Sequence, residues 1–280
     1  MVKKIILCIA ILSVVSISYA QKKEKIKGNK NVTIQETKVN SFNKIVVNDK
    51  FKIDIIEGSE AKIFIETDEN LHDIIQFSVA DSVLSFNTTK RITSSKKMNI
   101  KVTYSNTLKH IETFDDGEIS SLTSINLPEV TLTNSGSSKA FLNIKTEKFK
   151  HINSDKARVK LNLEAGVATL ELGENSKIEA LINSDSLQVD MYQRSDAKIE
   201  GTVLSLDITT DNSSTFTGKN LTANTCNIVS GLNTDVYVQV KEQLSLDASG
   251  NSEIYIYENP KITIHNFKDT AKLYKKEMKN

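Results

Sequence analysis

The chain has 280 residues and a nearly balanced charge, with 36 Lys and Arg against 35 Asp and Glu. This balance gives no electrostatic reason to expect nucleic acid or an anionic membrane as a partner. The chain has only two prolines and no tryptophan, and it is rich in Ser, Thr and Asn. This composition is typical of a β-rich chain and argues against a helical enzyme.

Residues 1–20 have the pattern of a secretory signal peptide. Two lysines at positions 3 and 4 precede an apolar run over residues 5–15, and Ser18 and Ala20 are small residues suited to cleavage before Gln21. The run is too short to span a bilayer, so we expect no transmembrane segment in the mature chain. We therefore expect export to the periplasm, the cell surface or the medium.

The expected mature chain begins with a polar, lysine-rich stretch over residues 21–37, which we interpret as a flexible lead-in. It keeps a single cysteine, Cys226, because Cys8 lies in the leader, so no intramolecular disulfide is possible. Loss of the leader lowers the basic residues from 36 to 34, and the charge stays close to zero.

Residues 38–104 alternate apolar and polar side chains, most clearly from Ile45 to Ile55 and from Met98 to Tyr104. Alternation with period two indicates β-strands, and no ten-residue stretch keeps a helical period. We expect this region to form an N-terminal capping β-region.

From residue 105 to 267 the sequence repeats. Pairs of mostly apolar residues stand eight positions apart, and successive pairs follow at a mean spacing of about 19 residues. The pairs are Ile111/Ile119, Leu132/Ala140, His151/Val159, Leu170/Ile178, Met191/Ile199, Ile208/Phe216, Ile228/Val236 and Leu246/Ile254. Because stacked repeats bury an apolar column that one repeat cannot bury alone, the pattern predicts an all-β fold: a right-handed parallel β-helix (solenoid) of about eight rungs.

Several segments also resemble the head GIN domain, the putative auto-transporter adhesin family. The similarity rests on SLDITTDNSSTFTG, CNIVSGLNTDVYVQV and LSLDASGNSEIYIYENP, on the opening FNKIVVNDKFKIDIIEGS, and on Tyr257-Glu258-Asn259-Pro260 near the end. It covers about residues 38–267 and implies a single exported β-solenoid domain. The sequence departs from the family by lacking turn glycines at Ala157, Arg194 and Ser214, which puts the turn geometry in question.

One polar row is a candidate metal site. Asp190, Asp207 and Asn227 each precede the first apolar residue of successive predicted rungs, so stacking would let them approach a Ca²⁺ ion from one side. The alternative is a solvated polar row with no ligand. A polysaccharide lyase would require a basic residue beside the row, and no basic residue recurs there.

No other catalytic or cofactor-binding pattern is found. The four histidines, His72, His110, His151 and His265, are scattered, and none has a partner at metal-ligand spacing. His151 falls in the apolar column, and we expect a local shift that turns Ile152 inward instead. Cys226 precedes a strand and is interpreted as a packed thiol rather than a reactive one. We expect no cofactor and assign no catalytic residue.

Three tyrosines are the best candidates for ligand contact. If Val236 and Ile254 point inward, alternation turns Tyr237, Tyr255 and Tyr257 outward on adjacent rungs. Such a ladder could be a platform for a sugar or a partner chain. The alternative, which we favour, is cross-strand packing that shields the last rungs.

These features favour an exported, non-catalytic structural or adhesive module that binds a glycan or a surface protein. A carbohydrate-active β-helix enzyme (a polysaccharide lyase or hydrolase) is one alternative and would require a cleft lined by carboxylates and basic residues. A periplasmic sensing or signalling partner is another. Residues 268–280 are expected to form a short helical turn that caps the end of the solenoid.

Overall fold

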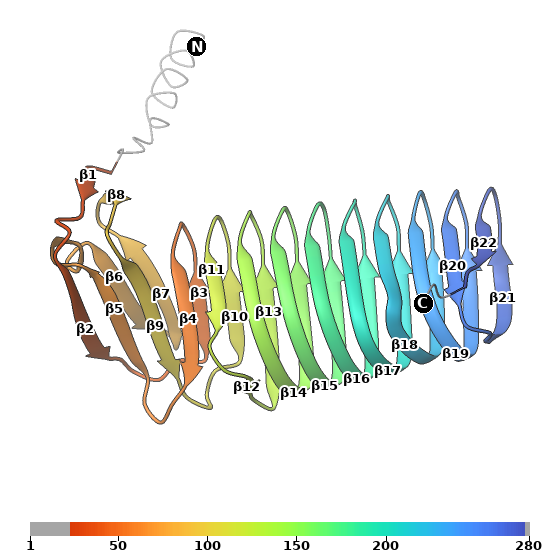
Figure 1. Cartoon of the computed structure of the whole chain (residues 1–280), viewed down its shortest axis with the longest axis horizontal. Helices are drawn as coiled ribbons and strands as arrows, with labels where there is room; N and C mark the ends of the chain where they lie inside the picture. Colours follow the sequence, from red (N-terminus) through yellow and green to blue (C-terminus); the bar gives the residue numbers. More distant parts are fainter. Residues whose placement is uncertain (1–22, 278–280) are drawn as a thin grey trace, which may run out of the picture.

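The computed structural model describes residues 23–277, which form one long rod of stacked β-strands (Figure 1). The all-β solenoid predicted from the repeat is confirmed, with about nine turns rather than eight. Its right-handed sense stays a prediction. The predicted signal peptide, residues 1–20, lies outside the described residues.

The strands fall into an N-terminal group and a repeating group. The first group is β1 (Lys25–Lys27), β2 (Val32–Lys38), β3 (Lys44–Val47), β4 (Lys52–Glu57), β5 (Lys62–Asp68), the 3₁₀ turn η1 (Glu69–Leu71), β6 (Ile75–Ala80), β7 (Val83–Thr88), β8 (Arg91–Ser94) and β9 (Met98–Tyr104). The second is β10 (His110–Thr113), β11 (Glu118–Ser121), β12 (Ile125–Asn126), β13 (Glu129–Asn134), β14 (Lys139–Asn153), β15 (Arg158–Leu172), β16 (Lys177–Met191), β17 (Asp196–Thr210), β18 (Thr215–Ser230), β19 (Asp235–Ala248), β20 (Glu253–Tyr257), β21 (Lys261–Phe267) and β22 (Lys272–Lys275).

Each long strand bends once and so contributes to two parallel sheets. Residues 139–146 of β14 pair with β11, β12 and β15, whereas residues 148–153 pair with β13 and β15. We call the sheet of β4, β11, the first halves of β14–β19, β20 and β22 the first sheet. The sheet of β3, β10, β13, the second halves of β14–β19 and β21 is the second sheet.

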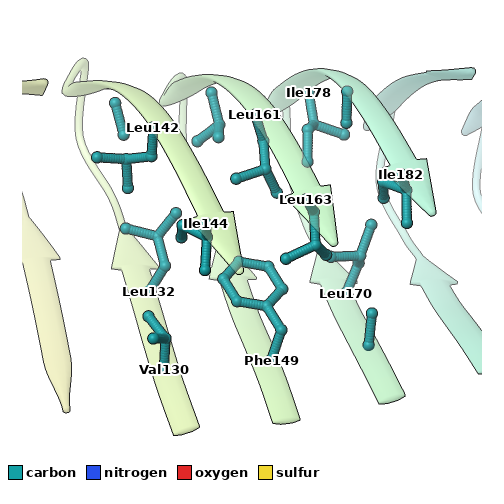
Figure 2. Packing of buried hydrophobic residues seen from close by; sticks show 14 of the residues in the cluster. Val130, Leu132, Leu142, Ile144, Phe149, Leu161, Leu163, Leu170, Ile178 and Ile182 are labelled. Atoms are coloured by element: carbon teal, nitrogen blue, oxygen red, sulfur yellow. The ribbon is translucent and has the colours of Figure 1, made fainter. Parts of the chain in front are cut away.

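Apolar side chains fill the space between the two sheets. Figure 2 shows Leu142 and Ile144 from one rung beside Leu161 and Leu163 from the next, all of them buried. One contiguous cluster runs from Phe42 to Ile256. Because every second residue of a strand points inward, each rung extends this column by one layer.

The predicted register holds for most rungs, but it is wrong at one. Leu170 pairs with Val189, not Met191, and Ile178 pairs with Ala197, not Ile199. The two predicted residues also point inward, since a shift of two positions keeps a side chain on the same face of a strand. Met191 and Ile199 were predicted because their side chains are larger than those of Val189 and Ala197, the residues that pair in the structure.

The turns between the two sheets form without the family's glycines. Arg194 adopts a positive φ of 64°, as Asp155 does at 58°, whereas Gly136 supplies this conformation in an earlier turn. Ala157 and Ser214 occupy a different turn position, where buried small side chains stack on one another. Small size, not left-handed backbone, is what these two positions require.

The N-terminal strands extend both sheets. β3 and β4 pair in parallel with β10 and β11, so they form the first rung although they lie in the segment interpreted as a capping region. β7 then adds to β3 and β9 adds to β4, while β6, β5 and β2 continue antiparallel. The mixed pairing closes this end of the rod.

Two local expectations are wrong. The polar segment 21–37 is not a flexible lead-in throughout, because β1 pairs with β8 and β2 pairs with β5 along seven residues. At the other end, residues 272–275 form strand β22 rather than a helical turn, because Leu273 stacks on Ile254 and continues the inward column. A distant strand supplies the pairing of β2, which local composition does not reveal, whereas β22 continues the repeat of the rungs by one further step.

Candidate functional site

The predicted tyrosine ladder exists on the outer surface of the first sheet, with different members. Tyr237 and Tyr255 stack at 4.4 Å between ring centroids and 4° between planes, and Tyr255 and Tyr274 stack at 4.9 Å and 13°. Tyr257 is not in this stack, because it pairs with Gln239 in the neighbouring row. Tyr274 was missed because its segment was expected to be helical.

The stack is tied together by charged neighbours. The Tyr255 hydroxyl donates a hydrogen bond to Glu253, which also forms an ion pair with Lys272 at 2.8 Å. The bond to Glu253 raises the pKa of Tyr255, and burial raises the pKa of Tyr237. The Lys276 ammonium lies over the rings of Tyr255 and Tyr274, at 5.2 and 5.6 Å. Because both pKa values are raised, Tyr237 and Tyr255 are neutral at physiological pH.

The stacking geometry decides which part of each ring a ligand can reach. Rings that lie face to face at this spacing cover one another, so Tyr255 offers its edge and hydroxyl rather than a flat face. A flat apolar strip, as a sugar ring would need, is therefore not formed by Tyr237 and Tyr255. The ladder stabilises the last rungs and presents a row of polar edges.

A groove of about 530 Å³ lies on the same sheet, over β11 and β14–β17. The row that ends in the tyrosines begins there. We call it the outer row: Phe141, Lys160, Glu179, Lys198, Thr217, Tyr237, Tyr255 and Tyr274, each paired with the next. The groove was not predicted from the sequence, because it is formed only when side chains from several rungs are aligned in the fold.

The groove combines apolar and hydrogen-bonding side chains. Phe141 and Leu181 are exposed in it, whereas Asn162 donates a hydrogen bond of 2.7 Å to the Asn143 side chain. Its carboxylates are paired with lysines, Glu179 with Lys160 at 3.3 Å and Glu200 with Lys198 at 3.4 Å. This arrangement suits an extended polar ligand with apolar faces.

The candidate metal row is only partly assembled. The Asn227 side chain donates a hydrogen bond to Asp207 at 2.7 Å. Asp190 pairs with Thr209 and so stands in the neighbouring row, and the Gln188 side chain donates a hydrogen bond to it at 2.7 Å. Within residues 23–277 there is no group of three or more His, Cys, Asp or Glu side chains placed to hold a metal ion. The geometry favours a solvated row.

His151 lies in the core, and the expected register shift that would turn Ile152 inward is wrong. The His151 ring is buried between Leu132 and Leu170, and its Nδ1 lies 3.2 Å from the Leu132 carbonyl oxygen. Burial lowers its pKa to about 4, so it is neutral at pH 7. Cys226 is also buried, and burial raises the pKa of its thiol, which keeps it protonated and unreactive.

The other histidines do not converge on a site. His72 contacts the Thr33 hydroxyl at 2.9 Å near the N-terminal end of the rod, and His265 contacts the Ser245 hydroxyl at 2.9 Å near the other end. His110 begins β10 and is exposed.

In the described part of the chain, no helix is long and apolar enough to cross a membrane.

Comparison with solved structures supports the fold. The chain is similar to an adhesin, named as putative, from Parabacteroides merdae ATCC 43184, with 16% identity, a TM-score of 0.58, and coverage of 90% of this chain and 99% of that one. A structure from Parabacteroides distasonis ATCC 8503 named as a putative lipid binding protein has 17% identity, a TM-score of 0.56, and coverage of 90% and 99%. Another from that strain, named as a putative adhesin, has 17% identity, a TM-score of 0.57, and coverage of 90% and 100%.

No curated protein matches the chain. The family model described as "Putative auto-transporter adhesin, head GIN domain" matches residues 41–260, which is most of the solenoid and much of the N-terminal region. This span agrees with the resemblance seen in the repeats and in the opening strands. The chain belongs to the head GIN domain family.

Proposed function

We propose that the protein is an exported, non-catalytic adhesive module that binds an extended glycan along the groove of the first sheet. The observation that carries this proposal is the alignment of Asn143, Asn162 and Leu181 in one row along the rod axis, with Phe141 in the adjacent row of the same groove. Sugar rings present apolar faces and hydroxyl edges, so they are matched by apolar side chains interleaved with amide and charged groups.

Three supports favour binding over catalysis. The family is described by its adhesin label. The groove carboxylates Glu179 and Glu200 are each engaged by a lysine, so neither is poised as a free acid or base. The groove is open along several rungs, which suits attachment to a polymer more than enclosure of a reacting bond.

The tyrosine ladder extends the same row toward the C-terminal end. We propose that the hydroxyl edges of Tyr237 and Tyr255 contact the end of a long ligand, with Tyr257 beside them in the next row. On this view the ladder contributes less to affinity than the groove, because its ring faces are already covered.

A glycan array tests the proposal. The protein should bind a defined set of polysaccharides, and the Phe141→Ser/Leu181→Ser variant should lose that binding while keeping its circular-dichroism spectrum. The matched control is Leu204→Ser/Val229→Ser, which removes two exposed apolar side chains outside the groove. Failure of the parent to bind any glycan, or unchanged binding by the groove variant, would contradict the proposal.

A further inference from the structure

A second cleft, of about 820 Å³, lies at the junction between the N-terminal strands and the first turns of the solenoid. β1 and β8 form a separate two-stranded ribbon there, outside the large sheet. Figure 1 places this ribbon on the same side of the rod as the β3–β4 turn. The cleft shares no lining residue with the groove of the first sheet, so it is an independent feature.

The deeper part of the cleft is apolar. Phe51 lies at its base and is itself almost fully buried. Ile92 and Met98 are partly buried, pack against the hydrophobic core and also line the cleft. An apolar ligand segment placed over these three side chains would remove hydrocarbon from water on both partners.

The rim of the cleft carries opposite charges on facing elements. On the ribbon side the rim residues are Lys23 and Arg91. On the side of the two turns they are Asp49, Lys50, Asp115 and Asp116. Their formal charges cancel. Among residues 23–277 none of these six side chains forms an ion pair, although Lys90 and Glu24, which precede the two strands of the ribbon, do so at 2.8 Å.

The acidic side of the cleft is fixed by the backbone. Asp49 and Asp115 occupy matching left-handed positions of consecutive turns, with φ of 52° and 54°. The Asp116 amide donates to the Asp49 carbonyl at 2.9 Å and locks one turn on the other. The backbone of these acidic residues is therefore fixed before any ligand arrives, which lowers the cost of ordering them on binding.

We propose that this junction cleft binds a zwitterionic phospho-amphiphile, with its phosphate at Lys23 and Arg91, its ammonium at Asp115 and Asp116, and its hydrocarbon over Phe51. Guanidinium and ammonium groups are suited to phosphate oxygens, and the facing carboxylates complement a cation. The balanced charge of the rim selects a zwitterion over an anion. The volume lies within the range of small-molecule sites, about 300–1,000 Å³.

Isothermal titration calorimetry with short-chain lipids below their micelle concentration tests this proposal. Dihexanoyl phosphatidylethanolamine should bind saturably with one molecule per chain. Phosphoethanolamine alone, which lacks the hydrocarbon, and dihexanoyl phosphatidylglycerol, which lacks the cation, should each bind at least tenfold more weakly. If either of these two control probes bound as tightly as dihexanoyl phosphatidylethanolamine, the proposal would be overturned, as it would by no saturable binding of the first probe.

Charge-removing variants locate the site. Arg91→Gln and Asp115→Asn/Asp116→Asn should each weaken binding at least tenfold, and asparagine keeps the left-handed backbone at position 115. Arg158→Gln and Asp185→Asn remove exposed charges elsewhere and should leave the affinity unchanged. A cleft variant that binds as tightly as these controls would contradict the assignment.

Methyl NMR of ¹³C-methionine provides a readout that does not depend on a variant. The Met98 methyl lines the cleft and should shift on titration with the zwitterionic lipid, whereas Met191, sealed in the solenoid core, should not. Saturable binding that leaves the Met98 signal in place would show that the lipid sits elsewhere and would overturn the proposal.

Discussion

The long rungs β14–β19 and the N-terminal strands β3–β7 and β9 all bury apolar side chains, but the two regions are assembled differently. In the rungs, His151 stacks on Leu132 of the preceding rung and on Leu170 of the following one. In the N-terminal region, Ile45 pairs with Ile111, and β2 pairs with β5 although β3 and β4 lie between them in the sequence. Rung contacts join neighbouring repeats, whereas N-terminal contacts range from the adjacent strands β6 and β7 to pairs as distant in the sequence as Ile45 and Ile111.

This difference has consequences for stability. The stability of a solenoid is approximately the sum of the stabilities of its rungs and of the interfaces between neighbouring rungs. A destabilised rung therefore weakens mainly the rungs next to it. The N-terminal region joins parallel and antiparallel pairs in one unit, and its strands depend on one another together. We expect the rungs to unfold progressively and the N-terminal region to unfold as a block.

The largest effect should come from a buried charge in either region. Ile65→Asp in β5 and Ile228→Asp in β18 each place a carboxylate in the apolar core and should cost about 4 kcal/mol of unfolding free energy. Hydrogen exchange should separate them. We expect Ile65→Asp to expose β2, β5 and β9 together, and Ile228→Asp to expose the rungs around β18 while β14 stays protected.

The control for this comparison is Val229→Asp. Val229 adjoins Ile228 but is 53% exposed, so its substitution should cost less than about 0.5 kcal/mol. Similar thermal midpoints for the two neighbouring variants would refute the inward and outward assignment. Identical exchange patterns for Ile65→Asp and Ile228→Asp would refute the contrast between the regions.

A smaller effect is expected from acid, acting on one rung. The unfolded chain protonates His151 below about pH 6.5, but the folded chain does so only below about pH 4. The folded state therefore loses stability as the pH falls from about 6.5 to 4, by up to about 3 kcal/mol, and loses nothing through this group above that range.

His151→Leu, which copies Leu132 and Leu170 of the adjacent rungs, should remove this acid sensitivity. Denaturant titrations at pH 7 and pH 4.5 measure it, with His110→Leu as the exposed control. The two variants should differ mainly at the lower pH. A parallel fall of the parent and His151→Leu between the two pH values would show that His151 is not the buried base.

The smallest effect concerns the last rungs. Tyr255→Ser removes two ring stacks and should cost about 1–2 kcal/mol, whereas Tyr255→Phe keeps both stacks and should cost less than about 0.5 kcal/mol. Thermal melts of both variants measure the difference. If serine is tolerated as well as phenylalanine, the stack does not stabilise this end of the rod.

The same contrast explains what could be predicted from sequence. The rung period, the inward column and the outward position of Tyr237 and Tyr255 follow from local alternation, and the structure bears them out. The partner of β2 could not be predicted, because the strand that stabilises it, β5, is distant in the sequence. β22 lies one repeat beyond β20 and was missed because its segment was expected to be helical. The groove and the junction cleft also depend on alignment between rungs, which no single segment encodes.

The most direct test of the central claim is the dependence of affinity on ligand length. If an extended glycan lies along the rungs, oligosaccharides of the bound polysaccharide should bind more tightly with each added unit until the groove between Phe141 and Lys198 is filled, and then reach a plateau. Calorimetry over such a series measures this. An affinity that is already complete for a monosaccharide, and does not change with length, would contradict the claim.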